Sequence, residues 1–240
     1  MSELIPAILP KDFAELEDKM CLVAGRVPLV HIDVTDGTLT RGITWPKAGD
    51  RGEWQNILNE EEGLPCWEEL NFEVHLMIKD PLAIVDDWTR AGAERLTVHL
   101  EAFESDEELS LALNDLRNRF SMTSFVNTEV GLAVNFDTPI ESVLPHVEEA
   151  DFVHLMSIAE IGAQGHGFEE GIFERIAAIR DEYPDTIISV DGGVGPVNVE
   201  RLIDAGVNRL IVGSAIYAAP EPLDALDELL EIVQGHELFN

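Results

Sequence analysis

The sequence predicts an α/β protein folded as a closed (β/α)8 barrel, the TIM barrel, and three observations lead to this fold class. Eight short runs of aliphatic and β-branched residues recur along the 240 residues. Amphipathic segments with helical periodicity lie between most of these runs. The chain length suits one barrel of this kind, and no linker, low-complexity tract or shift in composition divides it. We therefore expect residues 1–240 to form a single barrel domain.

The eight runs have the length and composition of buried strands in a parallel sheet. They cover residues 7–9, 29–34, 72–78, 95–101, 130–135, 152–158, 186–192 and 209–214. The intervening helical segments include FAELEDKM, IFERIAAIRDEY and VNVERLIDAG. Alternating strands and helices require parallel strands joined by right-handed crossovers. Eight such units in this length favour a closed barrel over an open sheet.

One long interruption, residues 37–70, follows the second strand and carries three of the four tryptophans. On a barrel, the connection that leaves the end of a strand emerges at the C-terminal face, where active sites lie. We expect this loop to be a lid or a subunit contact, with a decorative surface insertion as the alternative. Exposed tryptophans there would favour a homo-oligomer.

The formal net charge of −32 limits the possible partners. Nucleic acids and anionic membrane surfaces would be repelled, so we expect neither as a partner. Such an excess of acid suits molar salt, where screening is strong, and we hypothesise a salt-adapted host. The alternative is an ordinary acidic protein. The N-terminus has no basic leader followed by an apolar run, and no stretch of eighteen apolar residues occurs, which predicts a soluble, cytoplasmic protein.

Two cysteines are present, Cys21 and Cys66, without the spacing of metal ligands. We expect buried, reduced thiols rather than a disulfide.

The second strand, in the stretch VHIDVTDG, carries ionisable residues where a buried strand should be apolar. Because side chains alternate along a strand, His31 and Asp33 point to one face and Asp36 to the other. Burying two ionisable groups is costly unless they bind each other, a metal or a substrate. We interpret Asp36 as structural, capping the loop that follows.

Polar residues recur where the strands end, at the mouth of the predicted barrel. They are His31, Asp33, His75, His99, Glu101, Asn135 and Asp191. Two histidines and two aspartates converging there would form a site for a divalent cation. The alternative for each histidine taken alone is a hydrogen-bonded core residue. We expect His99 and Glu101 to lie behind the site or in the core.

Glycines follow the last two strands. Gly192 and Gly193 end the seventh strand, and Gly213 and Ser214 end the eighth. These loops, with the helix that follows, form the usual phosphate site of such barrels, where backbone N–H groups bind the anion without lysine. Simple tight turns are the alternative. Gly193-Val194-Gly195 is not interpreted as a dinucleotide-binding motif, because the third glycine of that motif is missing.

Taken in order, the motifs resemble the ribulose-phosphate 3-epimerase family. The matching segments are IPAILPKDFAELE, HIDVTDG, EVHLMIKDP, TVHLEA, GLAVNFDTP, DFVHLM, ISVDGG and AGVNRLIVGSAIY, and they span nearly the whole chain. The resemblance implies a TIM barrel of the ribulose-phosphate-binding type. It also implies one divalent metal ion (Zn, Fe, Mn or Co) held by the residues that match the family's ligands, namely His31, Asp33, His75 and Asp191. In the family the two aspartates are also the catalytic acid and base, and Met77 and Met156 match methionines of the pocket wall.

Several positions depart from the family pattern. Ala7 stands where the family usually has a substrate-contacting serine, and Thr35 where a methionine is expected. Pro10 and Lys11 alter the turn that follows, and no FVPN-like run follows Gly37. Residues 161–168 replace the PGFGGQ-like loop and are one residue longer. These departures concern substrate recognition rather than the four metal ligands.

The expected reaction is inversion of C3 in a phosphorylated ketose, most simply D-ribulose 5-phosphate to D-xylulose 5-phosphate in the pentose phosphate pathway. It needs two acid-base groups on opposite faces of the substrate, and Asp33 and Asp191 come from different strands. The alternatives are a 3-epimerase of a hexulose 6-phosphate such as allulose 6-phosphate, and a non-catalytic barrel that retains both sites. A decarboxylase or aldol-type synthase would need a lysine in a D-x-K-x-x-D pattern, which the chain lacks.

Overall fold

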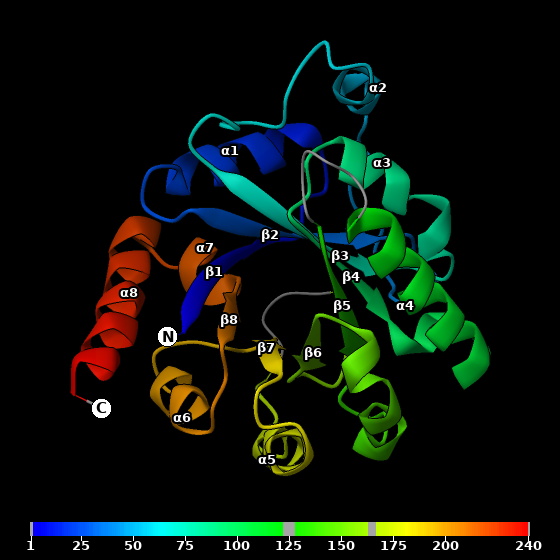
Figure 1. The fold of residues 1–240 in the computed structure, drawn as a ribbon. Coiled ribbons are helices and arrows are strands. Elements are labelled where there is room, and N and C mark those ends of the chain that lie inside the picture. Colours follow the sequence, from blue (N-terminus) through cyan, green and yellow to red (C-terminus); the bar gives the residue numbers. More distant parts are fainter. Residues whose placement is uncertain (1, 122–127, 163–166, 240) are drawn as a thin grey trace.

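The structure is a computed structural model that describes residues 2–121, 128–162 and 167–239. Its eight parallel strands pair in chain order and close into one barrel, so the predicted fold class is confirmed (Figure 1). The strands are β1 (Glu3–Ile8), β2 (Leu29–Thr35), β3 (Asn71–Met77), β4 (Arg95–His99), β5 (Glu129–Val134), β6 (Phe152–Met156), β7 (Ile187–Asp191) and β8 (Arg209–Val212).

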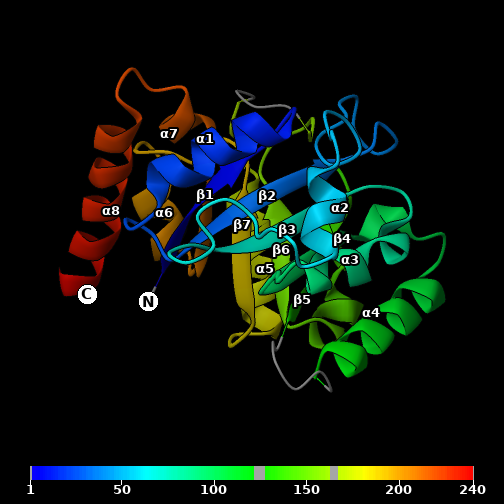
Figure 2. The ribbon, with the colours of Figure 1, turned by 90° about the horizontal axis from the view of Figure 1, so that it is seen from above.

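Helices surround the barrel as an outer layer. They are α1 (Phe13–Val23), α2 (Glu53–Leu58), α3 (Val85–Arg90), α4 (Asp106–Ser121), α5 (Ile172–Glu182), α6 (Val199–Asp204), α7 (Ser214–Tyr217) and α8 (Pro222–Phe239). Between β5 and β6 the described chain forms two 3-10 turns, Ile140–Ser142 and Leu144–Glu149, in place of an α-helix. Figure 2 shows α8 alongside α6 and α7, where it closes the ring near β1. Within the described ranges, no helix is both long and apolar enough to cross a bilayer.

Most strand boundaries fall within two residues of the prediction, and β1 is the exception. Its strand runs from Glu3 to Ile8 rather than over residues 7–9. Pro6 lacks a backbone N–H and normally weakens a strand assignment. Here β1 nevertheless pairs with β8 from Glu3 to Pro6 and with β2 at Ala7 and Ile8. The barrel therefore supplies β1 with neighbours on both sides, which local sequence does not reveal.

The main hydrophobic core lies between the sheet and the helices. Alternate strand residues, such as Val30, Ile32 and Val34 of β2, face this layer and are buried. Inside the barrel, Ile5, Ala7, Leu29 and Ile211 form a small apolar cluster of their own. The interior is otherwise largely polar, so ionisable side chains occupy positions that aliphatic residues usually fill in such barrels.

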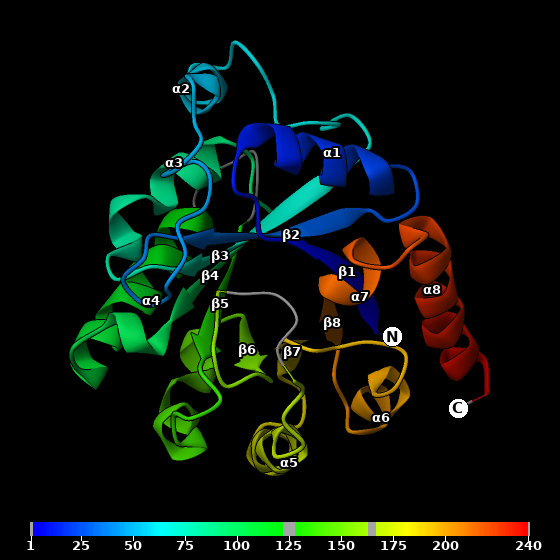
Figure 3. The ribbon, with the colours of Figure 1, turned by 180° about the vertical axis from the view of Figure 1, so that it is seen from behind.

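Hydrogen bonds attach the loop 37–70 to the end of β2. The Thr44 hydroxyl donates to the Asp33 carbonyl (3.1 Å) and accepts from the Thr35 N–H (2.8 Å). Asp36 accepts from the Thr38 N–H (2.9 Å), in line with a structural role. Figure 3 shows α2, which belongs to this loop, standing outside the ring next to α3.

Trp45 of this loop is fully buried, so it offers no aromatic surface to a second subunit. Its ring lies 5.3 Å from that of Trp54 and 5.9 Å from that of Trp88 on α3. These contacts attach the loop to the outside of the barrel. Trp67, which is 63% exposed, keeps an exposed aromatic surface in the loop, and the subunit contact stays a prediction.

The expectation of buried, reduced thiols was wrong. Cys21, exposed on α1, and Cys66, partly exposed in the loop, form a disulfide across 45 residues. The sequence did not reveal this pairing because only the packing of the loop against α1 brings the two residues together.

Candidate active site at the barrel mouth

A pocket opens at the C-terminal ends of the strands. Its lining includes Asp33 and Asp191, Met77 and Met156, and the glycine-rich residues Gly192, Gly193, Gly213 and Ser214. Every residue predicted as catalytic, as pocket wall or as phosphate-binding therefore borders one space. No lysine or arginine is among the described residues that line it.

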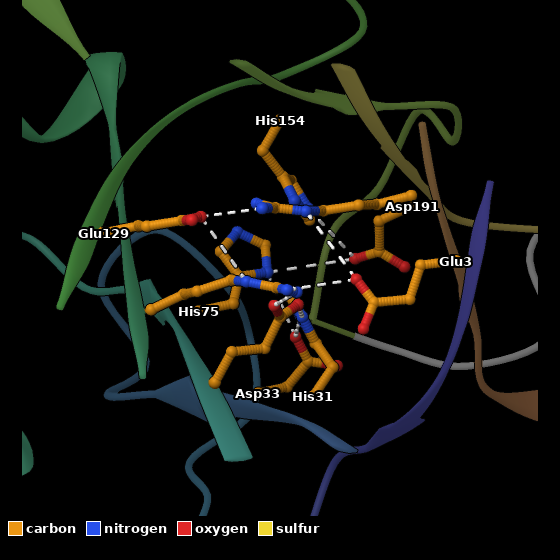
Figure 4. Close-up of polar contacts among 10 residues, drawn as sticks. Glu3, His31, Asp33, His75, Glu129, His154 and Asp191 are labelled. Atoms are coloured by element: carbon orange, nitrogen blue, oxygen red, sulfur yellow. Dashed lines mark hydrogen bonds and ion pairs between the residues drawn. The ribbon is translucent and has the colours of Figure 1, made fainter. Parts of the chain in front are cut away.

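His31 and His75 lie below this pocket and are fully buried. Asp33 Oδ1 is 3.3 Å from His31 Nε2 and 3.1 Å from His75 Nδ1. Asp191 Oδ2 is 3.8 Å from the same His75 Nδ1 (Figure 4). The structure thus brings together all four residues predicted as metal ligands.

His154 of β6 joins this group, although the sequence analysis did not single it out. Donor atoms of His31, His75, His154 and Asp191 all lie within 4.8 Å of one another. Asp33 lies next to this set through its contacts with His31 and His75. The missed signal was the two-residue spacing from Met156, because His154 shares the inward face of β6 with a residue already placed in the pocket.

Hydrogen bonds fix the orientation of His31. Its Nδ1 atom lies 2.6 Å from Glu73 Oε1, and Arg95 Nη1 donates to Glu73 Oε2 at 3.0 Å. Burial raises the pKa of Glu73, but His31 and Arg95 more than offset it and bring the pKa to about 2. An ionised Glu73 accepts a hydrogen bond from His31 Nδ1–H, so Nε2 is the ring nitrogen directed toward the cluster.

A second chain of hydrogen bonds fixes His75. Its Nε2 lies 2.7 Å from His99 Nε2, and His99 Nδ1 lies 3.0 Å from Glu101 Oε2. Burial raises the pKa of Glu101, whereas His99, Thr138 and the Asn135 N–H lower it to about 2. Since Glu101 is ionised, His99 donates to it and accepts the proton of His75 Nε2. His75 Nδ1 is then free to act as a ligand.

The pKa values of these histidines differ with their surroundings. Burial lowers the pKa of His75 well below its ordinary value, and the positive charges of nearby histidines lower it further. Burial also lowers the pKa of His154, and Asp191 offsets this only in part. Burial acts the same way on His31, but the carboxylates of Asp33 and Glu73 raise its pKa well above the ordinary value. The carboxylates around His31 thus favour a positive charge there.

The donor set fits a divalent cation. His31 Nε2 and both ring nitrogens of His154 are buried and have no hydrogen-bond partner among the described residues. Buried polar atoms normally have partners, and imidazole nitrogens beside carboxylates are ligands suited to Zn, Fe, Mn or Co.

Hydrogen bonds from Ser157 hold the backbone of Asp191 and Gly192 in place at the end of β7. The Ser157 N–H donates to the Asp191 carbonyl (2.7 Å), and its hydroxyl donates to the Gly192 carbonyl (2.6 Å). Gly192 and Gly193 have φ values of 110° and 66°. A Cβ on Gly192 would lie 2.7 Å from Ile158, so this turn requires glycine.

A family model described as the ribulose-phosphate 3 epimerase family matches residues 3–217. The chain belongs to this family. It is 29% identical over 233 residues to ribulose-phosphate 3-epimerase of Schizosaccharomyces pombe, covering 95% of this chain and 92% of the relative. It is 30% identical over 236 residues to the Bacillus subtilis enzyme of the same name, covering 95% and 98%.

Solved structures agree on the fold. The 3-hexulose-6-phosphate synthase of Salmonella typhimurium matches with a TM-score of 0.68 and 18% identity, over 98% of this chain and 99% of that one. Orotidine 5'-monophosphate decarboxylase of Sulfolobus solfataricus matches with a TM-score of 0.57 and 14% identity, over 98% and 99%. These likenesses concern the barrel alone.

The remaining departures from the family pattern have separate outcomes. Ala7 lines the pocket. Thr35 is fully buried, and its hydroxyl has no hydrogen-bond partner among the described residues. In the loop over residues 161–168, positions 163–166 lie outside the described residues.

Proposed function

We propose that the protein is a metal-dependent 3-epimerase of a phosphorylated ketose that interconverts D-ribulose 5-phosphate and D-xylulose 5-phosphate. One observation carries the proposal. The carboxylates of Asp33 from β2 and Asp191 from β7 line the same pocket, and they lie 3.1 and 3.8 Å from His75 Nδ1. The names of the curated relatives support the choice of substrate.

The proposed mechanism uses the two aspartates as acid and base. Asp33 accepts the C3 proton from one face. The C–H electron pair forms a C2–C3 double bond as the C2 carbonyl π pair moves onto its oxygen, which gives an enediolate. Asp191, which starts the cycle as the carboxylic acid, then delivers its proton to C3 from the other face and re-forms the C–H bond with inverted configuration. The roles are exchanged in the reverse direction.

The cluster beneath the pocket would hold the metal. A divalent ion bound by His31, Asp33, His75 and Asp191 would supply positive charge that stabilises the enediolate oxygens. Glu73 and His99 keep the two imidazoles oriented.

The pocket walls would exclude water and bind the phosphate. Met77 and Met156 present apolar, polarizable surfaces next to the carboxylates, which limits loss of the enediolate to solvent. Backbone N–H groups in the glycine-rich turns after β7 and β8 would bind the phosphate, as is usual in such barrels. This arrangement suits a pocket whose described lining has no cationic side chain.

A hexulose 6-phosphate such as D-allulose 6-phosphate is the second candidate substrate. Ala7 opens the pocket where the family usually has a serine, and Thr35 places a buried hydroxyl beside Met77 on the neighbouring strand. Ala7 lines the pocket and alters what a sugar would contact, whereas Thr35 would act only through its neighbour Met77. A non-catalytic barrel remains the alternative to both substrates.

Turnover of the two substrates tests the proposal. We expect kcat/KM for D-ribulose 5-phosphate to exceed that for D-allulose 6-phosphate, and Asp191→Asn to lower kcat by about 10³-fold because one proton-transfer group is lost. Asp36→Asn is the control, since Asp36 follows the same strand as Asp33 but bonds to Thr38 instead of lining the pocket. A higher kcat/KM for D-allulose 6-phosphate would identify the hexulose phosphate as the preferred substrate. Near-normal turnover by Asp191→Asn would refute the two-aspartate mechanism.

A further inference from the structure

His154 is a buried imidazole of the cluster that the proposed mechanism does not use. Its side chain is fully buried in the barrel interior. Neither ring nitrogen has a hydrogen-bond partner among the described residues. His99, also fully buried, differs in this respect because its two nitrogens bond to His75 and Glu101. A buried imidazole that makes no hydrogen bond is costly, so a partner for His154 beyond the 3.6 Å contact of Nε2 with Asp191 is to be expected.

The position of His154 identifies that partner. Its Nε2 atom lies 3.6 Å from Asp191 Oδ2, which is itself 3.8 Å from His75 Nδ1 (Figure 4). Atoms that each bind one ion at about 2.1 Å lie about 3 to 4 Å apart, so these separations suit ligands of a shared ion. The ring also stacks on His31, with centroids 5.4 Å apart and planes inclined by 11°.

We propose that His154 is a further ligand of the divalent ion and binds it through Nε2, so that three imidazoles share the site with the carboxylates. This inference rests on the proposed function only in requiring an ion at the barrel mouth. A third imidazole shifts the preference of the site toward Zn, Fe or Co and away from Mg or Ca. It also means that retention of the ion depends less on Asp191, which is proposed to carry a proton as well.

Proton NMR of the Co²⁺-loaded full-length protein tests this directly. Each ligating imidazole keeps one exchangeable ring N–H, and a paramagnetic ion shifts that signal far outside the usual range. We expect three such signals, from His31 Nδ1–H, His75 Nε2–H and His154 Nδ1–H. Two signals in the wild-type protein would overturn the proposal without requiring any variant to fold.

His154→Leu and Ser189→Ala form a matched pair for the Co²⁺ affinity, measured by competition with a chelator. Ser189 lies opposite His154 on β7, is buried and has an unpartnered hydroxyl among the described residues. We expect His154→Leu to lose one shifted signal and at least about tenfold in affinity, and Ser189→Ala to keep both. If His154→Leu kept the wild-type Co²⁺ affinity and all the shifted proton signals, His154 would be a core-packing residue and not a ligand.

The outcome is separable from that of the proposed function. Three shifted signals in a protein that epimerises no ketose phosphate would support the His154 ligand and refute the proposed reaction. Failure of the wild-type protein to bind Co²⁺, Zn²⁺, Mn²⁺ or Fe²⁺ would refute the ligand role together with the metal site.

Discussion

His31 Nδ1 lies 2.6 Å from Glu73 Oε1, across the pair of neighbouring strands β2 and β3. This contact connects the barrel mouth to an ionic network at the opposite end of the interior. Arg95 binds Glu73, Glu3 and Glu129, and Arg209 binds Glu129. The orientation of His31, a proposed metal ligand, thus depends on charges beneath it.

Glu73→Gln is expected to weaken divalent metal binding by about 10- to 100-fold, because it removes the charged acceptor that fixes His31. Co²⁺ affinity measured by chelator competition checks this. Glu129→Gln is the control, since Glu129 binds Arg95 and Arg209, whereas the carboxylate against His31 Nδ1 belongs to Glu73. Equal affinities for Glu73→Gln and the wild-type protein would contradict the orienting role.

Glu101 predicts a pH dependence of stability. Its pKa is about 2 in the folded protein against an ordinary 4.5, so its ionised form stabilises the fold above about pH 4.5. This contribution, about 3 kcal/mol at neutral pH, is lost as the pH falls toward 2. Glu101→Gln should lower the free energy of unfolding at pH 7 and flatten its decline below pH 4.5.

Urea unfolding at a series of pH values measures this effect. Glu107→Gln, on the exposed side of α4, should keep the wild-type pH profile. Parallel profiles for Glu101→Gln and the wild-type protein would mean that the His99–Glu101 contact does not contribute to stability.

The Cys21–Cys66 disulfide predicts sensitivity to reductant. Closing a 45-residue loop stabilises the fold by about 4 kcal/mol in the chain-entropy model, so reduction should lower Tm. The Cys21→Ser/Cys66→Ser double variant should melt at this lower temperature with or without reductant. An identical Tm for the oxidised and reduced wild-type protein would mean that the disulfide does not contribute to thermal stability.

The net charge of −32 predicts that salt stabilises the protein. Screening of repulsion between carboxylates should raise Tm between roughly 0.05 and 3 M KCl. Thermal melts monitored by circular dichroism across this range check the hypothesis of a salt-adapted host. A Tm that does not change with salt would favour an ordinary acidic protein.

Sequence periodicity was sufficient to predict the barrel, because a chain of eight alternating strands and helices can form few sheet topologies. It also placed His31, Asp33, His75 and Asp191 at the strand ends, where they meet. It did not reveal His154 or Glu73, whose importance depends on which strands become neighbours and on which rows of side chains stack inside the barrel. The Cys21–Cys66 pairing was missed for the same reason, since it is a long-range contact made by loop packing.

Proton NMR of D-ribulose 5-phosphate incubated with the metal-loaded protein in D2O, at high salt, tests the two-aspartate epimerisation most directly. Because Asp191 lines the pocket, it should exchange its proton with solvent between turnovers, so the proton that it delivers to C3 should come from D2O. We expect deuterium at C3 together with the appearance of D-xylulose 5-phosphate. A folded, metal-loaded protein that produces neither would contradict the proposed reaction and leave the hexulose phosphates or a binding role.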